Sequence, residues 1–591
     1  MSLVNAKDFE VLLKLDKVPL LGNLVGRLIM FLTQLNKVNK VYDRHKNKTA
    51  LHFLNSLLDE YDINFHVSES DLEKIPRGDA FITISNHPLG GIDGAILLRI
   101  LLSVRDDYKI IANFLLQKLE PISSHIMPVN PFEDRKDQKS SVKGLIAALK
   151  HLEQGNPLGI FPAGEVSTLK EKNIYVDSKW EDGAIKLIKK ANVPVLPIYF
   201  HAKNSPWFYR LSSISGVLRT LKLPSELGNK RKQIIHVKIG TPIKPKEIKA
   251  IDDLEVLKNF LREKTYLLSK SFLRKRKQIN EYRTHLKKKA KEIASPKNHQ
   301  DICNEIEGIR TLKKRLFVSN EYEVFLTKAD NIPNLMQEIG RLREITFRLI
   351  GEGTNKKSDT DKFDSYYHHL ILWNTEEERF VGAYRMGLGE EIFKRNGFKS
   401  FYVSTFFNFS KEMDEKLPKT IEMGRAFIVP EYQQKPMPLF LLWRGIAAVT
   451  IKYPQYEYLM GGATISNLFT NYSKSLMMSF LENYYSNADI TPYVTSKNPF
   501  KVDLTISEKR YMESFVGPEV KKLDAIIKEV EGDKLRLPVL IKQYIKQNAK
   551  FVAYNVDHDF NDAIDALIFM RISDIPRSTI EPILKDVTIE N

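Results

Sequence analysis

The chain has 591 residues, a length at which polypeptides normally divide into two or more domains, and its 43% of apolar residues are enough for two full cores. Its 90 basic and 73 acidic residues give a net charge of +17, which favours anionic partners such as nucleic acid, anionic lipid or an acidic protein. The single cysteine, Cys303, excludes an intramolecular disulfide and fits a reducing compartment. The histidines lack ligand spacing, so no metal site is predicted.

The first half of the chain alternates apolar strands with amphipathic helices, which predicts an α/β fold. Strands are expected at residues 80–85, 158–161, 195–200 and 234–239, and helices at 94–102 and 180–191. Before them, the apolar stretch 18–35 contains Pro19, Asn23 and Arg27 and falls short of the ~20 uninterrupted residues of a spanning helix. It is expected either to lie in a membrane interface or to pack as a core helix. No secretory signal peptide is predicted at the N-terminus.

The turn after the first of these strands carries Asn86 and His87 and leads to Asp93. A histidine at such a turn can take the proton of an alcohol that attacks a thioester, when a carboxylate fixes its tautomer and stabilises its charged form. Gly90 and Gly91 permit backbone angles that other residues avoid, and the start of the helix offers amides for developing negative charge. A helix-capping aspartate beside a hydrogen-bonded histidine would give the same pattern, so the surrounding sequence decides between the two interpretations.

That surrounding sequence resembles the PlsC-like glycerolipid acyltransferase superfamily over about the first half of the chain. Three blocks of the family are met at Asn86, His87 and Asp93, at Phe161 to Gly164, and at Val193 to Ile198. A further block, which in the family usually ends in an arginine that binds an anionic head group, is matched loosely, with Asn130 and Arg135 as the candidates.

Two departures from the family pattern concern the site itself. Five residues separate His87 from Asp93 where the family has four, and Ala163 stands where the family has a glutamate, with Glu165 displaced by two positions. Both departures resemble a subgroup of bacterial aminolipid acyltransferases. The resemblance implies that His87 is the catalytic base and Asp93 its orienting acid. The substrate-binding residues that it implies are Asn86, Asn130, Arg135, Phe161, Pro162, Gly164 and Glu165.

The second half resembles the GNAT-like N-acyltransferases that are related to autoinducer synthases and to the first enzyme of ornithine-lipid synthesis. The landmarks are Arg341 to Arg343 with Phe347, Asp364, His369 to Leu372, Val381 to Met386, Glu422 to Phe427, Leu442 to Ile446, and Tyr554 to Asp565 with the cluster Asp557, Asp559 and Asp562. A strand at 380–386 and a helix at 439–453 are expected among them. The order and spacing of these landmarks carry the resemblance, because no single one is specific.

An amine must be neutral to attack a thioester, so such a site needs a proton acceptor and groups that hold the charged ends of an amino acid. Glu422 is the candidate for base or ammonium anchor. The candidates for substrate binding are Arg343, Asp364, Arg385 and Arg425, since guanidinium groups grip oxyanions in a two-pronged way. A structural ion pair between Glu422 and Arg425 fits the same spacing, and the two interpretations stay open.

The predicted architecture is α/β with two domains. Residues 1–280 form a PlsC-like O-acyltransferase domain, residues 281–318 a basic helical linker, and residues 319–591 a GNAT-like N-acyltransferase domain. The basic runs at 274–277 and 287–289 are expected to be a solvated face or a contact for a membrane or carrier protein.

Together the two resemblances imply a bifunctional synthase of the ornithine-lipid type. One domain would transfer a 3-hydroxyacyl group to the amine of ornithine or glycine, and the other would esterify the 3-hydroxyl of that lyso-lipid. The expected acyl donor is acyl carrier protein or a CoA thioester, with no other cofactor. The expected partners are acyl-acyl carrier protein, a membrane surface and the amino acid, not nucleic acid. The expected location is cytoplasmic, peripheral on the inner face of the inner membrane.

Two other functions remain open at this point. A lysophosphatidate acyltransferase with a regulatory GNAT-like appendage would need a phosphate-binding arginine, for which Arg135 is the candidate. A non-enzymatic, haemolysin-like membrane-binding protein would not depend on His87.

Overall fold

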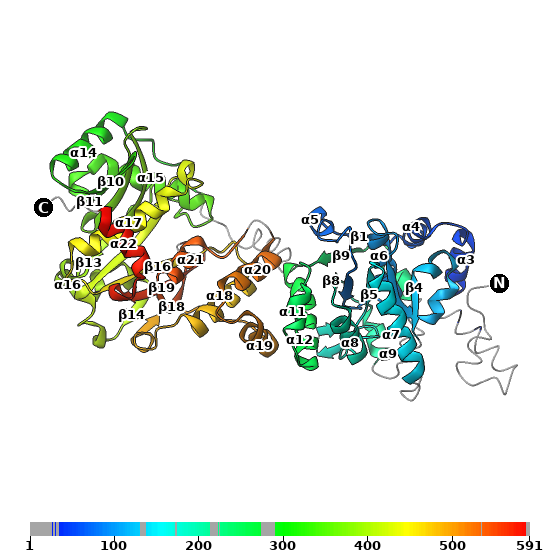
Figure 1. Cartoon of the computed structure of the whole chain (residues 1–591). Helices are drawn as coiled ribbons and strands as arrows, with labels where there is room; N and C mark the ends of the chain where they lie inside the picture. Colours follow the sequence, from blue (N-terminus) through cyan, green and yellow to red (C-terminus); the bar gives the residue numbers. More distant parts are fainter. Residues whose placement is uncertain are drawn as a thin grey trace. The chain divides into compact units, whose positions relative to one another are not determined.

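The computed structural model describes residues 27, 30, 35–129, 138–171, 174–212, 223, 225–272, 290–532, 535–558 and 560–586. The packing divides the chain into two compact units, Met1–Arg276 and Lys277–Asn591. Each unit combines a β-sheet with surrounding helices (Figure 1), so the prediction of a two-part α/β chain is confirmed.

The first unit is built on a seven-stranded sheet with the strand order β1-β9-β8-β2-β5-β3-β4. All neighbours in it run parallel except β8 and β9, which pair antiparallel. The strands are β1 (Asn64–His66), β2 (Ile82–Ser85), β3 (Lys109–Asn113), β4 (Ile126–Val129), β5 (Leu158–Ile160), β8 (Val195–His201) and β9 (Ile234–Ile239). A separate hairpin is formed by β6 (Thr168–Glu171) and β7 (Ile174–Val176).

Nine α-helices of this unit are described. They are α3 (Leu35–His45), α4 (Ala50–Glu60), α5 (Glu69–Leu72), α6 (Gly91–Leu102), α7 (Gln138–Glu153), α8 (Asp182–Ala191), α9 (Pro206–Ser212), α11 (Pro245–Lys249) and α12 (Leu254–Leu267). Of these, α6, α7 and α8 lie between parallel strands of the sheet. The four expected strands and the two expected helices are all present, within three residues of the predicted ends.

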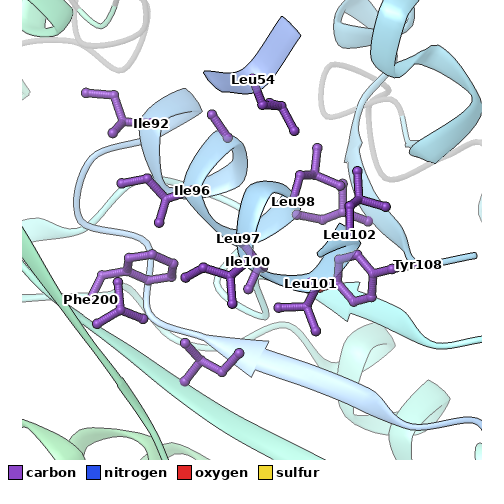
Figure 2. Packing of buried hydrophobic residues seen from close by; sticks show 14 of the residues in the cluster. Leu54, Ile92, Ile96, Leu97, Leu98, Ile100, Leu101, Leu102, Tyr108 and Phe200 are labelled. Atoms are coloured by element: carbon purple, nitrogen blue, oxygen red, sulfur yellow. The ribbon is translucent and has the colours of Figure 1, made fainter. Parts of the chain in front are cut away.

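The sequence of α6 explains why this helix occupies the centre of the core. Nine of its twelve residues are buried, because it is apolar on nearly every side. Figure 2 shows its leucines and isoleucines packed around Leu54 of α4, Tyr108 and Phe200 of β8. All four residues of β2 are buried as well, as expected for a parallel strand covered on both faces. The turn between β2 and α6 is therefore held between two rigid elements.

The second unit is built on an eight-stranded sheet with the order β10-β11-β12-β13-β15-β16-β19-β18. Its neighbours are antiparallel except β15 and β16, which pair parallel. The strands are β10 (Arg315–Ser319), β11 (Tyr322–Lys328), β12 (His368–Asn374), β13 (Arg379–Leu388), β15 (Thr420–Ile428), β16 (Tyr458–Ile465), β18 (Lys550–Asp557) and β19 (Ala563–Arg571). A small second sheet pairs β14 (Phe407–Phe409) with β17 (Val494–Ser496).

Several helices of this unit pack against the eight-stranded sheet. The described helices are α14 (His299–Thr311), α15 (Pro333–Leu349), α16 (Gly389–Asn396), α17 (Met437–Lys452), α18 (Asn471–Tyr484), α19 (Ile506–Tyr511), α20 (Val520–Glu531), α21 (Val539–Lys546) and α22 (Arg577–Asp586). Those that contact the sheet include α15 and α17. In α15 the ring of Phe347 contacts that of Phe427 on β15. In α17 Gly445 lets the helix approach Leu370 of β12, where an added Cβ would lie 2.9 Å from that side chain. The expected strand at 380–386 is β13 and the expected helix at 439–453 is α17.

The segment predicted as a linker, 281–318, includes regular structure from residue 299 onward. Helix α14 buries Ile302, Ile306 and Ile309 along one face, and β10 forms an edge strand of the eight-stranded sheet. Residues 281–289 lie outside the described part of the chain. The end of the predicted linker thus packs as part of the second unit.

Among the helices whose residues the structure describes, none is long and apolar enough to cross a membrane. The apolar stretch 18–35 lies almost entirely outside the described residues, so its predicted amphipathic helix is not tested.

Candidate functional site

The turn between β2 and α6 brings His87 and Asp93 together. Nδ1 of His87 lies 3.1 Å from Oδ2 of Asp93. The side chain of Asp93 is fully buried, whereas that of His87 is 18% exposed. Because the buried Nδ1 faces the carboxylate, Nε2 is the ring nitrogen left for a substrate.

The carboxylate of Asp93 is also the cap of its own helix. Oδ2 accepts hydrogen bonds from the backbone amides of Leu89 at 2.7 Å and Gly90 at 3.1 Å. Burial raises the pKa of Asp93, and the contact with His87 opposes that shift. Two amides at the start of α6 therefore bind Asp93, so the capping role that the sequence left open and the contact with His87 are both present.

Gly90 makes this turn possible. Its φ of +75° lies in the left-handed region, which costs a residue with a Cβ about 1 kcal/mol or more. A Cβ at this position would also lie 2.9 Å from Cδ2 of Leu223. The tight turn accommodates the five residues between His87 and Asp93, so the departure from the family spacing does not separate the pair.

Asn86 and Phe161, both predicted to bind substrate, hold the turn and the ring of His87 in place. The side-chain amide of Asn86 donates to the backbone oxygen of Phe200 at 3.0 Å and accepts from its backbone amide at 2.7 Å. This exchange joins the end of β2 to β8 and occupies both ends of the amide. The ring of Phe161 stacks on the imidazole of His87, with the centroids 4.0 Å apart. Stacking restricts rotation of the imidazole, so Phe161 orients the base as well as lining the site.

Asp177, which no motif indicated, holds the same turn from another segment. Its Oδ1 accepts from the backbone amide of His87 at 3.1 Å and from Oγ of Ser167 at 2.6 Å. Asn204 adds a bond from Nδ2 to the backbone oxygen of Pro88 at 2.9 Å. Both side chains are almost completely buried. The only sequence signal for Asp177 is its place just after β7, a carboxylate followed closely by a buried tryptophan.

The other predicted residues of this region shape the loop after β5. Pro162 accepts at its carbonyl from a backbone amide, and Gly164 adopts a φ of +66°. The carboxylate of Glu165 accepts a hydrogen bond from Oγ of Ser178. Ala163, at the position of the family glutamate, is buried with 3% of its surface exposed.

The residues predicted to bind a head group, Asn130 and Arg135, lie outside the described part of the chain. A described cation close to the site is Lys230, which is 3% exposed and donates from Nζ to the backbone oxygen of Lys203. Burial lowers the pKa of Lys230, while the negative charge of Asp93 acts against that shift.

In the second unit, three of the predicted substrate-binding residues form a buried ion network. Nη1 of Arg343 lies 2.8 Å from Oδ1 of Asp364, and Nη1 of Arg385 lies 3.2 Å from the same oxygen and 2.6 Å from Oδ1 of Asp361. Both arginine side chains are 0% exposed. Burial would raise the pKa of Asp364, but the two guanidinium groups hold it well below its usual range. The structure places these residues where they fix α15 and β13 to the intervening loop.

Both carboxylate oxygens of Glu422 accept hydrogen bonds from the protein. Oε1 accepts from the amide of Val403 at 2.8 Å, and Oε2 accepts from the amide of Tyr402 at 3.0 Å and from the hydroxyl of Tyr367. Its surface is 1% exposed and burial raises its pKa. This geometry favours an anchor for residues 402 and 403; a role as base in the chemistry stays a prediction.

Arg425 lies at an irregular point of β15. The register between β13 and β15 shifts here, and Arg425 has a φ of +51°, a strained conformation for a residue with a long side chain. Its guanidinium lies over the rings of Tyr402 and Phe560 and donates from Nη1 to the hydroxyl of Tyr402 at 3.0 Å. Nε lies 3.3 Å from Oδ2 of Asp359. With 11% of its side chain exposed, Arg425 is less enclosed than the two arginines of the network.

Two carboxylates that sequence analysis did not assign, Asp565 and Glu352, lie near each other, and the charge of Arg425 acts on Asp565. Asp565 on β19 accepts from Oγ1 of Thr464 at 3.2 Å. Burial, with the charge of Asp557, raises the pKa of Asp565 to about 7. Burial, with the charge of Asp565, raises the pKa of Glu352 to about 8. In the sequence, Asp565 is a carboxylate inside an otherwise apolar strand, and Glu352 is a glutamate between two glycines.

Comparison with known proteins agrees with both halves of this geometry. Residues 27–274 match a family model described as acyltransferase, and residues 342–443 match one described as acetyltransferase (GNAT) domain. A glycine N(alpha)-acyltransferase of Phocaeicola vulgatus is 30% identical over 279 residues, which cover 44% of this chain and 84% of that protein. The chain therefore belongs to the same acyltransferase family as this glycine N(alpha)-acyltransferase.

Further relatives of this acyltransferase carry two different names. A glycine N(alpha)-acyltransferase of Bacteroides thetaiotaomicron is 29% identical over 299 residues, covering 48% of the chain and 87% of the relative. A lyso-glycine lipid O-acyltransferase of the same organism is 27% identical over 215 residues, covering 35% of the chain and 76% of the relative. The enzyme therefore combines an N-terminal acyltransferase domain with a C-terminal GNAT domain, as the two resemblances implied.

Proposed function

We propose that this acyltransferase makes a doubly acylated glycine lipid by two successive transfers. The GNAT domain would join a 3-hydroxyacyl group to the amine of glycine. The N-terminal domain would then esterify the 3-hydroxyl of the resulting lyso-lipid. The observation that carries the proposal is that one chain matches relatives named for each of these two steps over most of their lengths.

The geometry at His87 supports the ester-forming step. Nε2 of His87 is free to take the proton of the lipid hydroxyl while its oxygen attacks the thioester carbonyl. Asp93 stabilises the imidazolium so formed. When the carbon–sulfur bond breaks, the imidazolium returns the proton to the leaving thiolate. The stacked ring of Phe161 keeps the imidazole in one orientation through both transfers.

Of the two amino acids that the sequence left open, glycine is the one we propose, because the amide-forming relatives are named for it. The acyl donor we propose is acyl carrier protein, whose acidity would complement a chain with a net charge of +17. Fusion of the two domains would hold an amphiphilic intermediate near the second site, which raises its effective concentration. A membrane surface is the proposed place of both steps.

Expression in a bacterium that lacks aminolipids, followed by lipid extraction and mass spectrometry, tests the proposal. The intact chain should yield both the monoacylated and the diacylated glycine lipid, with the amino acid identified by growth on isotope-labelled glycine. The His87→Ala variant should yield the monoacylated lipid alone.

A matched control is His52→Ala, which removes an exposed histidine of α4 in the same unit and should leave both lipids unchanged. The proposal fails if the intact chain yields no labelled lipid. The assignment of the ester-forming site fails if His87→Ala still produces the diacylated form.

A further inference from the structure

The central strands of the second sheet separate beside Arg425. Strands β15 and β16 pair in parallel only from Thr420 with Tyr458 to Met423 with Gly461. Beyond that point β15 stays paired with β13, and β16 stays paired with β19. Gly462 is exposed although it lies on an interior strand of an eight-stranded sheet. The separation of β15 and β16 therefore leaves an opening that solvent or a substrate can enter.

Asp565 borders this opening. Its Oδ1 lies 3.7 Å from the position that a Cβ would occupy on Gly462, and it also accepts the hydroxyl of Thr464. Residues 462 and 464 lie on the same side of β16, since side chains alternate along a strand. The carboxylate of Asp565 thus lies on the same face of the sheet as the position of a side chain at the exposed Gly462.

Glu352 approaches the same place from the loop after α15. It is 8% exposed, and within the described part of the chain its carboxylate has no hydrogen-bond or ion-pair partner. The loop is fixed beside the opening, because Asn561 donates to the backbone oxygen of Gly351 at 3.1 Å and Ser466 donates to that of Ile350 at 2.8 Å. A mostly buried carboxylate without a partner favours a proton or a cation beside it.

Arg425, which also contacts Asp359 and Asp361, brings a positive charge to the opening. It lies on β15 across the opening, and its positive charge acts on Asp565. An acidic pair facing a guanidinium is the complement of an α-amino acid, which carries an ammonium and a carboxylate about 3 Å apart. The strained φ of +51° at Arg425 fits a residue whose orientation matters for binding.

We infer that Glu352 and Asp565 bind the ammonium of the amino-acid acceptor, that Asp565 takes its proton, and that Arg425 binds its carboxylate. The inference rests on the proposed amide-forming function. In the step, the ammonium gives one proton to Asp565. The neutral nitrogen then forms a bond to the thioester carbonyl carbon, the carbon–sulfur bond breaks, and a second proton passes from nitrogen to the leaving thiolate.

The acidity of Asp565 agrees with this task. A pKa of about 7 leaves Asp565 ionised for part of the time near neutral pH, as an effective base requires. The charged or titratable groups that face Asp565 are Asp557 on β18, Arg425 on β15, Tyr402 in the loop before β14, and Glu352.

Steady-state N-acylation by the purified full chain tests the inference, with glycine varied against a saturating 3-hydroxyacyl thioester of acyl carrier protein. Asp565→Asn should lower kcat at least 100-fold and abolish the rise of rate with pH near 7. Glu352→Gln should raise KM for glycine at least tenfold with a smaller effect on kcat. Asp565→Glu, which keeps the carboxylate, should retain a measurable part of the rate.

Asp574→Asn is the matched control, since it removes an exposed carboxylate just after β19 and should change nothing. Thermal unfolding of each variant separates lost chemistry from lost folding. The inference is overturned if well-folded Asp565→Asn keeps the wild-type rate and pH profile. If the wild type itself acylates another amino acid but not glycine, the proposed substrate fails while the same variants still test the pocket with that amino acid. If the wild type acylates no amine, both fail.

Discussion

Replacing Asp93 with asparagine tests how the ester-forming site works. The variant keeps the size of the side chain and an oxygen that can accept from the amides of Leu89 and Gly90. It removes the negative charge that faces Nδ1 of His87. The lost quantity is therefore the stabilisation of the imidazolium that forms when His87 takes the proton of the lipid hydroxyl.

The magnitude follows from the distance between the two groups. At 3.1 Å the attraction between unit charges is about 5 kcal/mol for an effective dielectric constant of about 20. A hydrogen bond from the imidazolium to the neutral asparagine oxygen regains about 1–2 kcal/mol of this. The barrier should rise by about 3–4 kcal/mol, so the O-acylation rate should fall on the order of 10²–10³-fold.

The assay is O-acylation of supplied lyso-lipid by the purified chain, with Asp252→Asn as a control that removes an exposed carboxylate of the same unit. Burial raises the pKa of Asp93, so in the wild type the buried charge reduces stability as pH rises through that pKa. The stability of Asp93→Asn relative to wild type should therefore increase with pH, which thermal unfolding at pH 5 and pH 8 would measure. A folded variant that keeps more than a third of the wild-type rate would refute the role given to Asp93.

The other predictions concern the supports of both sites. Gly90→Ala should lower the unfolding midpoint and the O-acylation rate, because the positive φ and the contact of the new Cβ with Leu223 cost about 1–3 kcal/mol. The control is Gly94→Ala, where the new Cβ meets open space, and it should lower neither quantity. Asp177→Ala leaves three donors unpaired, the amide of His87, Oγ of Ser167 and Nε1 of Trp180, so kcat should fall about tenfold or more and urea denaturation should show a loss of about 1–3 kcal/mol. Arg385→Met removes one of the two guanidinium groups from Asp364 and from Asp361, which keep Arg343 and Arg425, and should destabilise the C-terminal unit by about 1–3 kcal/mol in the same measurement; unchanged stability would show that Arg385 is dispensable to the ion network.

In the N-terminal unit, the sequence was enough to predict those site residues that lie close together along the chain. His87 and Asp93 were predicted together because a strand, a glycine turn and a helix follow one another within twenty residues. Asp177 could not be predicted, since it reaches His87 only after ninety residues of chain have folded between them. The nearby Trp180 is the only signal in its immediate sequence, and it does not indicate a contact with His87.

In the C-terminal unit the candidate residue types could be predicted from the sequence, but their surroundings could not. Arginines and acids were expected to bind substrate, yet whether a guanidinium faces solvent or a buried aspartate depends on tertiary packing, as Arg343 and Arg425 illustrate. Glu352 and Asp565 are more than two hundred residues apart, and only the separation of β15 from β16 brings them to one opening. Neither could have been paired from local pattern.

The most direct test of the account is a reconstitution with the purified chain as the sole enzyme, supplied with isotope-labelled glycine, a 3-hydroxyacyl carrier protein and a second acyl thioester. Mass spectrometry over time should show a labelled monoacylated product that appears first and is then converted to the diacylated lipid. A labelled monoacylated product that is never consumed, or no labelled product at all, would contradict the claim that one chain performs both transfers.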